Sequence, residues 1–172
     1  MAVLISAGHS NQDPGAVANG RREAEIATDF RNILVTCLAD LGIQAETDGK
    51  DKDNLPLREA VKLAKGKDIA IEIHLNAAAN PTASGVETLS GPDDMQLGAK
   101  LCAAVSQALN IKNRGAKPEN AGQHHRLAFV QAGGIILELF FITNPNDLAA
   151  YDGRKWPLGR AVGKVIEDAY RA

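Results

Sequence analysis

Two histidines and a glutamate of this chain stand where a metal-dependent reaction could be built. His9 directly follows a short apolar segment, residues 3–6, and His74 lies near the end of another, residues 68–75. Glu138 lies inside an almost wholly apolar run, where a buried carboxylate must be paired, metal-bound or protonated. Two imidazoles with carboxylates form the donor set of zinc sites that keep one position open for water. These residue types therefore indicate a zinc-dependent hydrolase.

The remaining protein ligand is predicted to be a glutamate at the start of a long helix. Glu23 leads the apolar stripe of that helix, which includes Phe30 and Leu34. Glu25 is rotated by about 200° from Glu23 and falls on a flank of the helix. We therefore expect Glu23, and not Glu25, to face the site.

Glu72 and Asn76 leave alternatives open on the predicted strand that carries His74. Both alternate onto the same strand face as His74. Glu72 could replace Glu23 as a metal ligand, or it could orient His74 through a hydrogen bond. Asn76 could cap the end of the strand or touch a substrate.

Each ligand candidate also has an ordinary structural explanation. His9 and His74 could be hydrogen-bonded histidines at strand ends, and Glu23 could be stabilised by the helix dipole. Glu138 could pair with a cation in the core. The four residues share no compact motif of the HExxH kind, so the argument for zinc depends on their joint placement in the fold.

Alternating strand and helix patterns predict an α/β domain that brings these residues together. The expected strands are residues 3–6, 43–47, 68–75, 85–89, 127–130 and 135–141. The expected helices are residues 22–41, 55–65 and 93–109, one that begins at Asn144-Pro145, and a last one from Trp156-Pro157 to Tyr170. Polar loops are expected at residues 10–20 and 110–126. The pattern predicts three layers around a twisted, mostly parallel or mixed sheet of about six strands, with ligands beyond the carboxyl ends of strands.

The composition excludes several classes of protein. The chain of 172 residues is 45% hydrophobic and 23% charged, which is typical of a globular domain and not of a disordered or fibrous chain. A formal net charge of −2 gives no indication of a nucleic-acid partner. No apolar run approaches the ~20 residues of a membrane span. Cys37 and Cys102 fall in apolar helical stretches and are expected to be buried thiols. We expect one domain over residues 1–172.

The first residues do not have the pattern of an export signal. Met1 is followed by the apolar residues 2–5 and then at once by Ser6-Ala7-Gly8-His9, with no basic segment before them. This pattern favours a first strand, and we expect the chain to carry no export signal of its own.

Short motifs along the chain resemble those of the type-3 family of zinc-dependent N-acetylmuramoyl-L-alanine amidases. The opening segment, residues 5–16, is similar to the first motif of the family, and later segments follow in the family's order. These are Gly20-Arg21-Arg22-Glu23, Leu57-Arg58, residues 68–77, Gly85-Val86-Glu87-Thr88, Arg114-Gly115-Ala116-Lys117 and residues 137–144. The resemblance covers essentially the whole chain.

The resemblance implies a role for each of the candidate residues. His9, Glu23 and His74 would hold one Zn²⁺ per chain, and Glu138 would be the catalytic glutamate. The substrate would be peptidoglycan, cleaved at the amide between the lactyl group of N-acetylmuramic acid and L-alanine of the stem peptide. Candidate substrate contacts are Asn76, Arg114 and His125, the last in the pair His124-His125 of the predicted polar loop.

Four positions depart from the family pattern. Ser10-Asn11 replaces a Gly-Gly pair, which changes the loop without removing a ligand. Glu72 stands where a small serine is common and adds a carboxylate near the metal. Phe140 stands where glycine is common and is expected to reshape the floor of the groove.

Other activities remain open beside the amidase. A zinc carboxypeptidase-like enzyme would need a basic clamp for a terminal carboxylate, which Arg58, Arg114 or Arg126 could supply. A non-catalytic wall-binding module would be expected to have lost a ligand or Glu138, and neither is lost.

The expected biological setting is that of a phage or prophage endolysin without a separate wall-binding domain. Such a monomer would stay in the host cytoplasm until a holin opens the membrane, and would then act on the periplasmic or cell-wall peptidoglycan. The segment between His74 and Glu138 has no room for a long inhibitory helix, so we expect an open site. The alternative is a chromosomal amidase of wall recycling or division.

Overall fold

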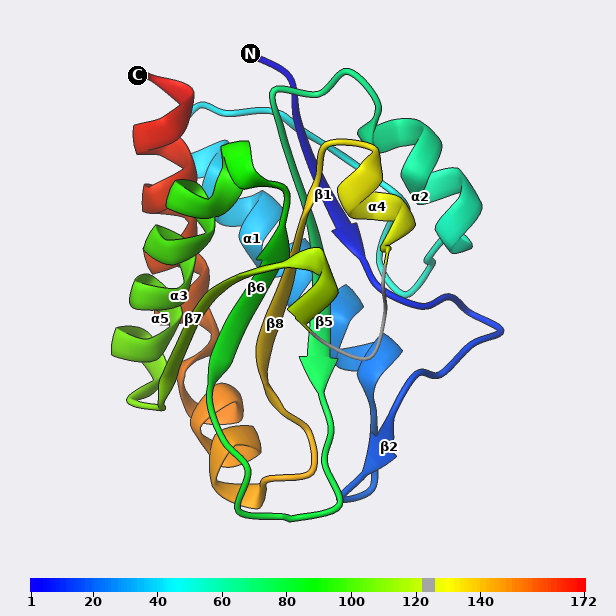
Figure 1. Cartoon of the computed structure of the whole chain (residues 1–172), viewed down its shortest axis with the longest axis vertical. Helices are drawn as coiled ribbons and strands as arrows, with labels where there is room; N and C mark the ends of the chain where they lie inside the picture. Colours follow the sequence, from blue (N-terminus) through cyan, green and yellow to red (C-terminus); the bar gives the residue numbers. More distant parts are fainter. Residues whose placement is uncertain (122–125) are drawn as a thin grey trace.

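A six-stranded sheet forms the middle layer of the protein in the computed structural model, which describes residues 1–121 and 126–172 (Figure 1). Its strand order is β4-β1-β5-β8-β6-β7, and all neighbouring strands are parallel except β6 and β8, which are antiparallel. The strands are β1 (Val3–Ala7), β4 (Ala45–Thr47), β5 (Ile69–Asn76), β6 (Val86–Ser90), β7 (Asn113–Pro118) and β8 (Ile135–Phe141). The predicted α/β class with a mixed sheet is confirmed.

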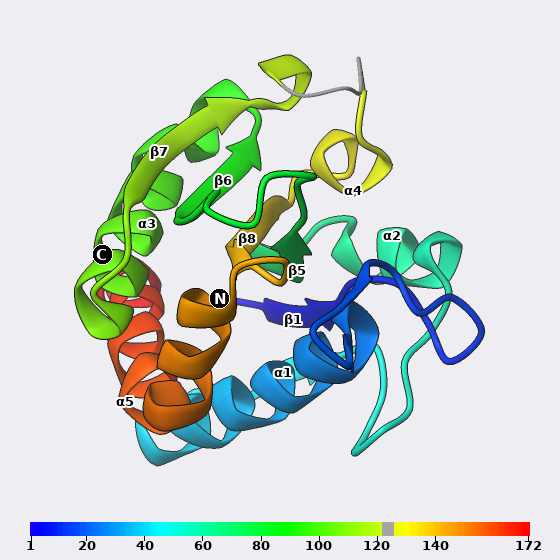
Figure 2. The ribbon, with the colours of Figure 1, turned by 90° about the horizontal axis from the view of Figure 1, so that it is seen from below.

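Helices cover both faces of this sheet (Figure 2). One face packs against α1 (Glu23–Asp40), α3 (Met95–Leu109) and α5 (Pro145–Tyr170). The other face packs against the shorter helices α2 (Leu57–Ala64) and α4 (Ala128–Gln131). Two 3₁₀ turns, η1 (Pro92–Asp94) and η2 (Glu119–Ala121), flank α3 and β7. Within the described residues, no helix combines the length and apolar character needed to span a membrane.

The pattern of β5 accounts for the two faces. Every second residue enters the larger core beneath α1, α3 and α5, namely Ile69, Ile71, Ile73 and Leu75. The side chains between them point to the opposite face because successive strand residues alternate. There Ala70 joins Leu4 and Ile136 in the smaller core beneath α2 and α4.

The face beneath α2 and α4 changes from apolar to polar along the strands. Beyond Ala70 on β5, the alternation places Glu72, His74 and Asn76 on this face. Beyond Ile136 on β8, it places Glu138 there, and the register sets Glu138 beside His74. The fold therefore gathers ionisable side chains from adjacent strands on one half of one sheet face.

Several predicted elements differ in the structure. Residues 127–130 were expected as a strand, but Leu127 caps a short helix, α4, which spans Ala128–Gln131. A four-residue apolar run is too short for its periodicity to separate helix from strand. The expected loop of residues 110–126 contains β7, an edge strand of mostly polar and small residues whose only partner among the described strands is β6. The expected loop of residues 10–20 contains part of a hairpin formed by β2 (Val17–Ala18) and β3 (Arg21–Arg22).

The two helices expected at the C-terminal end are one continuous helix, α5, with Pro157 in its interior. Proline was expected to begin a new helix because it removes a backbone donor. Buried residues lie on both sides of it, Leu148 and Tyr151 before it and Leu158 and Val162 after it. Packing against the core along the whole length of α5 therefore outweighs the lost hydrogen bond.

A fully buried ion pair holds the end of β1, two residues before His9. Arg31 of α1 donates from Nη1 to Asp48 Oδ1 at 3.2 Å, and both side chains are fully buried. The Asp48 carboxylate also accepts a hydrogen bond from the backbone N–H of Ala7 at 3.1 Å. Burial raises the pKa of the Asp48 carboxyl, and the charge of Arg31 opposes that rise.

We expect Asp48→Ala to lower the free energy of unfolding by about 3–5 kcal/mol, because it leaves the Arg31 guanidinium buried without a counter-ion. Urea denaturation followed by circular dichroism measures this change. Glu59→Ala is the control, since Glu59 forms an exposed pair with Lys62 and its loss should move the midpoint far less. Equal midpoints for the two variants would contradict the role assigned to the buried pair.

Candidate metal centre and active site

Three side chains from separate parts of the chain converge at the polar half of the sheet face. His9 follows β1, Glu23 is the first residue of α1, and His74 lies on β5. His9 Nε2 lies 2.9 Å from Glu23 Oε2, and His74 Nδ1 lies 3.1 Å from Glu23 Oε1. One ligand atom from each of the three lies within 4.8 Å of the others. The carboxylate of Glu23 therefore lies between two imidazoles.

Glycines allow the two histidines and Glu23 to approach one another. A Cβ at Gly8 would lie 2.3 Å from the His74 ring, and a Cβ at Gly15 would lie 2.6 Å from the His9 ring and 2.7 Å from Glu23 Oε2. Gly15 also has a φ of +65°, a conformation that favours glycine. Any other residue at either position would push a ligand out of place.

The backbone at His9 is held in an uncommon conformation. His9 has a φ of 67°, which is costly for a residue with a side chain and occurs where surrounding contacts enforce it. Asn54 Nδ2 donates to the carbonyl oxygen of Gly8 at 2.9 Å, and Asn54 N–H donates to Asn11 Oδ1 at 2.6 Å. The loop after β4 therefore fixes the segment that presents His9.

Glu23 is fixed from two sides by backbone donors. The N–H of Leu75 donates to Glu23 Oε1 at 2.9 Å, and the N–H of Ala16 donates to Oε2 at 3.0 Å. Glu23 is 4% exposed, whereas Glu25 is exposed on the helix flank, so the inward direction expected for Glu23 is confirmed.

The charges of the three side chains depend on one another. Burial by itself would raise the pKa of Glu23, but the hydrogen bonds from His74 and His9 hold it well below its usual range. Burial lowers the pKa of His74, yet its hydrogen bonds to Glu23 and Glu72 raise it well above the ordinary value. The hydrogen bond to Glu23 raises the pKa of His9 against the effect of burial. The carboxylates around the two imidazoles therefore favour a positive charge between them.

Each histidine also contacts a second carboxylate through its other ring nitrogen. His74 Nε2 lies 2.8 Å from Glu72 Oε1, and His9 Nδ1 lies 2.9 Å from Asp13 Oδ2. The two partners differ in environment, because Glu72 is 3% exposed and the side chain of Asp13 is 63% exposed. In His74, Nε2 contacts the buried carboxylate of Glu72, whereas Nδ1 faces Glu23.

Glu138 lies next to this cluster on the neighbouring strand. The register of β5 and β8 pairs it with His74, and its Oε2 atom is buried without a hydrogen-bond partner in the described chain. Burial raises the pKa of Glu138 to about 7, the charge of His74 opposes the rise, and the charges of Glu23 and Glu87 add to it. A buried carboxylate oxygen without a partner is suited to accept a proton or a water molecule.

The donor set fits a zinc ion. His9, Glu23 and His74 offer two nitrogens and one carboxylate oxygen, which is the ligand type of catalytic zinc sites with an open fourth position. The buried and unpartnered Oε2 of Glu138 lies on the adjacent strand, as expected beside such an open position.

A family model described as N-acetylmuramoyl-L-alanine amidase (Amidase_3) matches residues 3–168. The chain belongs to this amidase family. The family hydrolyses peptidoglycan, so the amidase assignment expected from the sequence motifs is confirmed.

A solved structure and a curated relative agree with the assignment, and a more distant solved structure shares the fold. A Neisseria meningitidis structure assigned to the N-acetylmuramoyl-L-alanine amidases is 49% identical, with a TM-score of 0.92 over 99% of this chain and 96% of that one. The catalytic domain of CD27L, an endolysin targeting Clostridia difficile, is 20% identical with a TM-score of 0.80, and the alignment covers 98% of this amidase and 97% of that domain. LytC of Bacillus subtilis, an N-acetylmuramoyl-L-alanine amidase, is 25% identical over 84% of this chain, which corresponds to 30% of LytC.

Two of the three predicted substrate contacts, Asn76 and Arg114, lie together in the structure. Asn76 and Arg114 both contact Glu87, a residue to which the sequence motifs assign no role. The sequence shows only that Glu87 is a glutamate within the predicted strand 85–89. Its position beside the site follows from the pairing of β6 with β8, which sets Glu87 opposite Glu138. His124 and His125 lie outside the described residues.

Phe140 does not line the site of the amidase. It is fully buried on the other face of the sheet, where its ring stacks on Tyr151 with centroids 5.3 Å apart. The expectation that it shapes the groove floor was therefore wrong. The register shifts between β5 and β8 after His74, and Leu139 and Phe140 both enter the larger core.

Proposed function

We propose that this amidase holds one zinc ion through His9, Glu23 and His74 and cleaves the amide between N-acetylmuramic acid and L-alanine of the stem peptide. The observation that carries the proposal is the convergence of these three ligands beside the unpartnered Oε2 of Glu138. When bound, a zinc ion with three protein ligands supplies Lewis acidity to a water molecule and to the substrate carbonyl.

Glu138 acts as the general base and general acid of the reaction. Its carboxylate takes a proton from the attacking water and delivers it to the leaving nitrogen, which departs as the amino group of L-alanine. Glu23 stays fixed by its backbone donors, and the two histidines are held by the carboxylates of Glu23, Glu72 and Asp13.

Digestion of purified peptidoglycan by the zinc-loaded protein tests this function. Mass spectrometry should find stem peptides with free N-terminal alanine and glycan strands of unchanged length. New reducing sugar ends, or cleavage only within the stem peptide as by a carboxypeptidase, would contradict the proposed bond.

Glu72 supports the metal centre by orienting His74. A carboxylate that accepts the outer N–H of a metal-bound imidazole fixes the tautomer and the direction of the ring. Because Glu72 contacts Nε2, the Nδ1 atom of His74 stays free to face Glu23. This arrangement supports an orienting role for Glu72 over a role as ligand in place of Glu23.

We expect Glu72→Ala to weaken zinc affinity about 10- to 100-fold, the range for loss of such an outer partner. Competition with a chromophoric chelator measures the affinity. Glu72→Gln should lose less, because its amide oxygen still accepts the Nε2 hydrogen bond. Asp13→Ala should also lose less, since Asp13 is mostly exposed to water. A larger loss for Asp13→Ala than for Glu72→Ala would contradict this order.

We also propose an endolysin-like setting, in which one chain acts alone and a holin gives it access to the wall. The three ligands and Glu138 all come from one chain. The side chains of His9 and His74 are 22% and 18% exposed, which supports a site that needs no activating step.

Expression in bacteria with and without a holin, followed by culture turbidity, tests this setting. Lysis only with the holin is the expected result. Lysis without any pore would indicate export by the chain itself. No lysis with the holin, from zinc-loaded protein that cleaves peptidoglycan in vitro, would favour a wall-recycling amidase.

A further inference from the structure

Glu87 is the centre of a cationic cluster beside the catalytic residues. Its Oε2 atom accepts from Arg114 Nε at 2.7 Å and from Lys117 Nζ at 2.6 Å, and its Oε1 accepts from Asn76 Nδ2 at 3.1 Å. Burial would raise the pKa of Glu87, but Lys117 and Arg114 lower it, so the carboxylate stays charged. Two cations against one carboxylate leave the cluster with one net positive charge.

The register of the sheet places this cluster in line with the reaction site. Glu87 of β6 pairs with Glu138 of β8, and Glu138 pairs with His74 of β5. Lys117 lies on the next strand, β7, where it pairs with Leu89 of β6. A row of ionisable side chains therefore crosses four adjacent strands, from the metal ligand to the cations.

The two cations keep donors for a further partner. Arg114 and Lys117 are 30% and 31% exposed, and each makes one side-chain hydrogen bond in the part of the chain that the structure describes. The Arg114 guanidinium lies over the Phe141 ring at 5.0 Å from its centroid. Its face and its Nε are thus fixed, and its Nη amino groups form a preoriented fork of the kind that binds carboxylates.

We propose that Arg114 and Lys117 form a subsite for a free carboxylate of the stem peptide, one residue beyond the L-alanine of the cleaved bond. This inference rests on the proposed function and names the substrate group that the site recognises. The muramic acid side of the bond offers no free carboxylate, because its lactyl carboxyl is the group bound in the amide. The anionic group must therefore belong to the peptide.

The dimensions of the sheet agree with this position. Neighbouring strands lie about 4.8 Å apart, so Glu87 lies roughly 10 Å across the sheet from His74. Two extended peptide residues span about 7 Å. A carboxylate on the second residue therefore comes within reach of side chains that extend from β7 to Glu87.

Two substrates that differ only in this carboxylate test the subsite. They are N-acetylmuramoyl-L-alanyl-γ-D-glutamyl-L-lysine amide, whose α-carboxylate on the second residue is free, and the same peptide with D-isoglutamine as the second residue, in which that carboxylate is an amide. The zinc-loaded wild type should cleave the free acid with a kcat/KM about 10- to 100-fold higher, the effect of a charge-assisted hydrogen bond. Arg114→Gln and Lys117→Gln should each reduce this ratio toward one, mainly by raising KM for the free acid.

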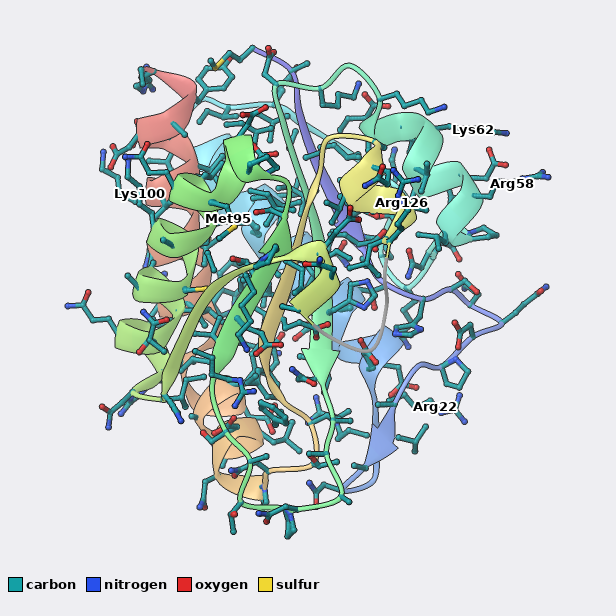
Figure 3. The ribbon with its side chains drawn as sticks, viewed as in Figure 1. Arg22, Arg58, Lys62, Met95, Lys100 and Arg126 are labelled. Atoms are coloured by element: carbon teal, nitrogen blue, oxygen red, sulfur yellow. The ribbon has the colours of Figure 1, made fainter. Side chains whose placement is uncertain are left out.

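Matched controls separate recognition from a structural role. Lys62→Gln removes a cation of α2 that points away from the sheet, and should leave the ratio unchanged (Figure 3). Arg114→Gln alone leaves the Glu87 carboxylate without its partner Arg114. The double variant Arg114→Gln/Glu87→Gln removes that carboxylate as well. It should still lack discrimination.

Three results would count against the subsite or the function. Equal kcat/KM of the wild type for both substrates would overturn the subsite alone. Restored discrimination in the double variant would show that Arg114 only balances the charge of Glu87, and would also overturn it. Failure of the wild type to cleave either substrate, or peptidoglycan itself, would instead contradict the proposed function.

Discussion

Glu138→Gln should lower kcat by about 10²- to 10⁴-fold, which is the usual cost of removing a general base. Glutamine has nearly the same shape as glutamate but takes up no proton from water. Among the described residues Glu138 forms no ion pair and its Oε2 atom has no hydrogen-bond partner, so the substitution breaks no such contact. The fold and the zinc content should therefore stay as in the wild type.

Release of stem peptides from peptidoglycan measures this loss, with zinc content determined by atomic spectroscopy on the same samples. Glu46→Gln is a matched control, because Glu46 is an exposed glutamate of β4 that pairs with Lys67 and lies away from the ligands. If Glu138→Gln kept more than a tenth of wild-type turnover, Glu138 would not be the proton carrier. If it lost zinc, its role would be in binding the metal.

Glu23→Ala should abolish stable zinc binding, which is the largest effect that we expect on the metal. The substitution removes a ligand and also the carboxylate that lies between His9 and His74. Its loss should exceed the 10- to 100-fold expected for Glu72→Ala, because Glu72 acts only through His74.

Glu25→Ala is the control, because it removes a glutamate of the same helical turn that faces outward. Zinc content after dialysis against a weak chelator should be near zero for Glu23→Ala and one ion per chain for Glu25→Ala. The reverse pattern would mean that the wrong glutamate has been assigned as the ligand. Equal retention by both variants would mean that a residue other than Glu23 completes the site.

The direction of individual side chains could be predicted from the sequence. The alternation in residues 69–76 assigns Glu72 and His74 to one face of β5, because successive strand side chains point to opposite faces. The helical period separates Glu23 from Glu25 in the same way. These inferences hold because they depend only on local backbone geometry. The family motifs then related the residues to an amidase.

Elements with weak local signals could not be predicted. α4 has four helical residues, too few to show a helical period, and β7, which pairs with β6 alone among the described strands, has the composition of a loop. Pro157 suggested a break in α5 that packing along the helix prevents. In each case the tertiary contacts outweigh the local preference.

The neighbours of each strand were decided only by the tertiary structure. The sequence joins β5 to β6 without a helix, yet β6 pairs with β8 and β7 and not with β5. This pairing sets Glu87 opposite Glu138 and brings Arg114 toward the catalytic row. Strand order depends on contacts between residues far apart in the chain, and no local period records them. The sequence therefore determined which residues can act, and the sheet decided which of them meet.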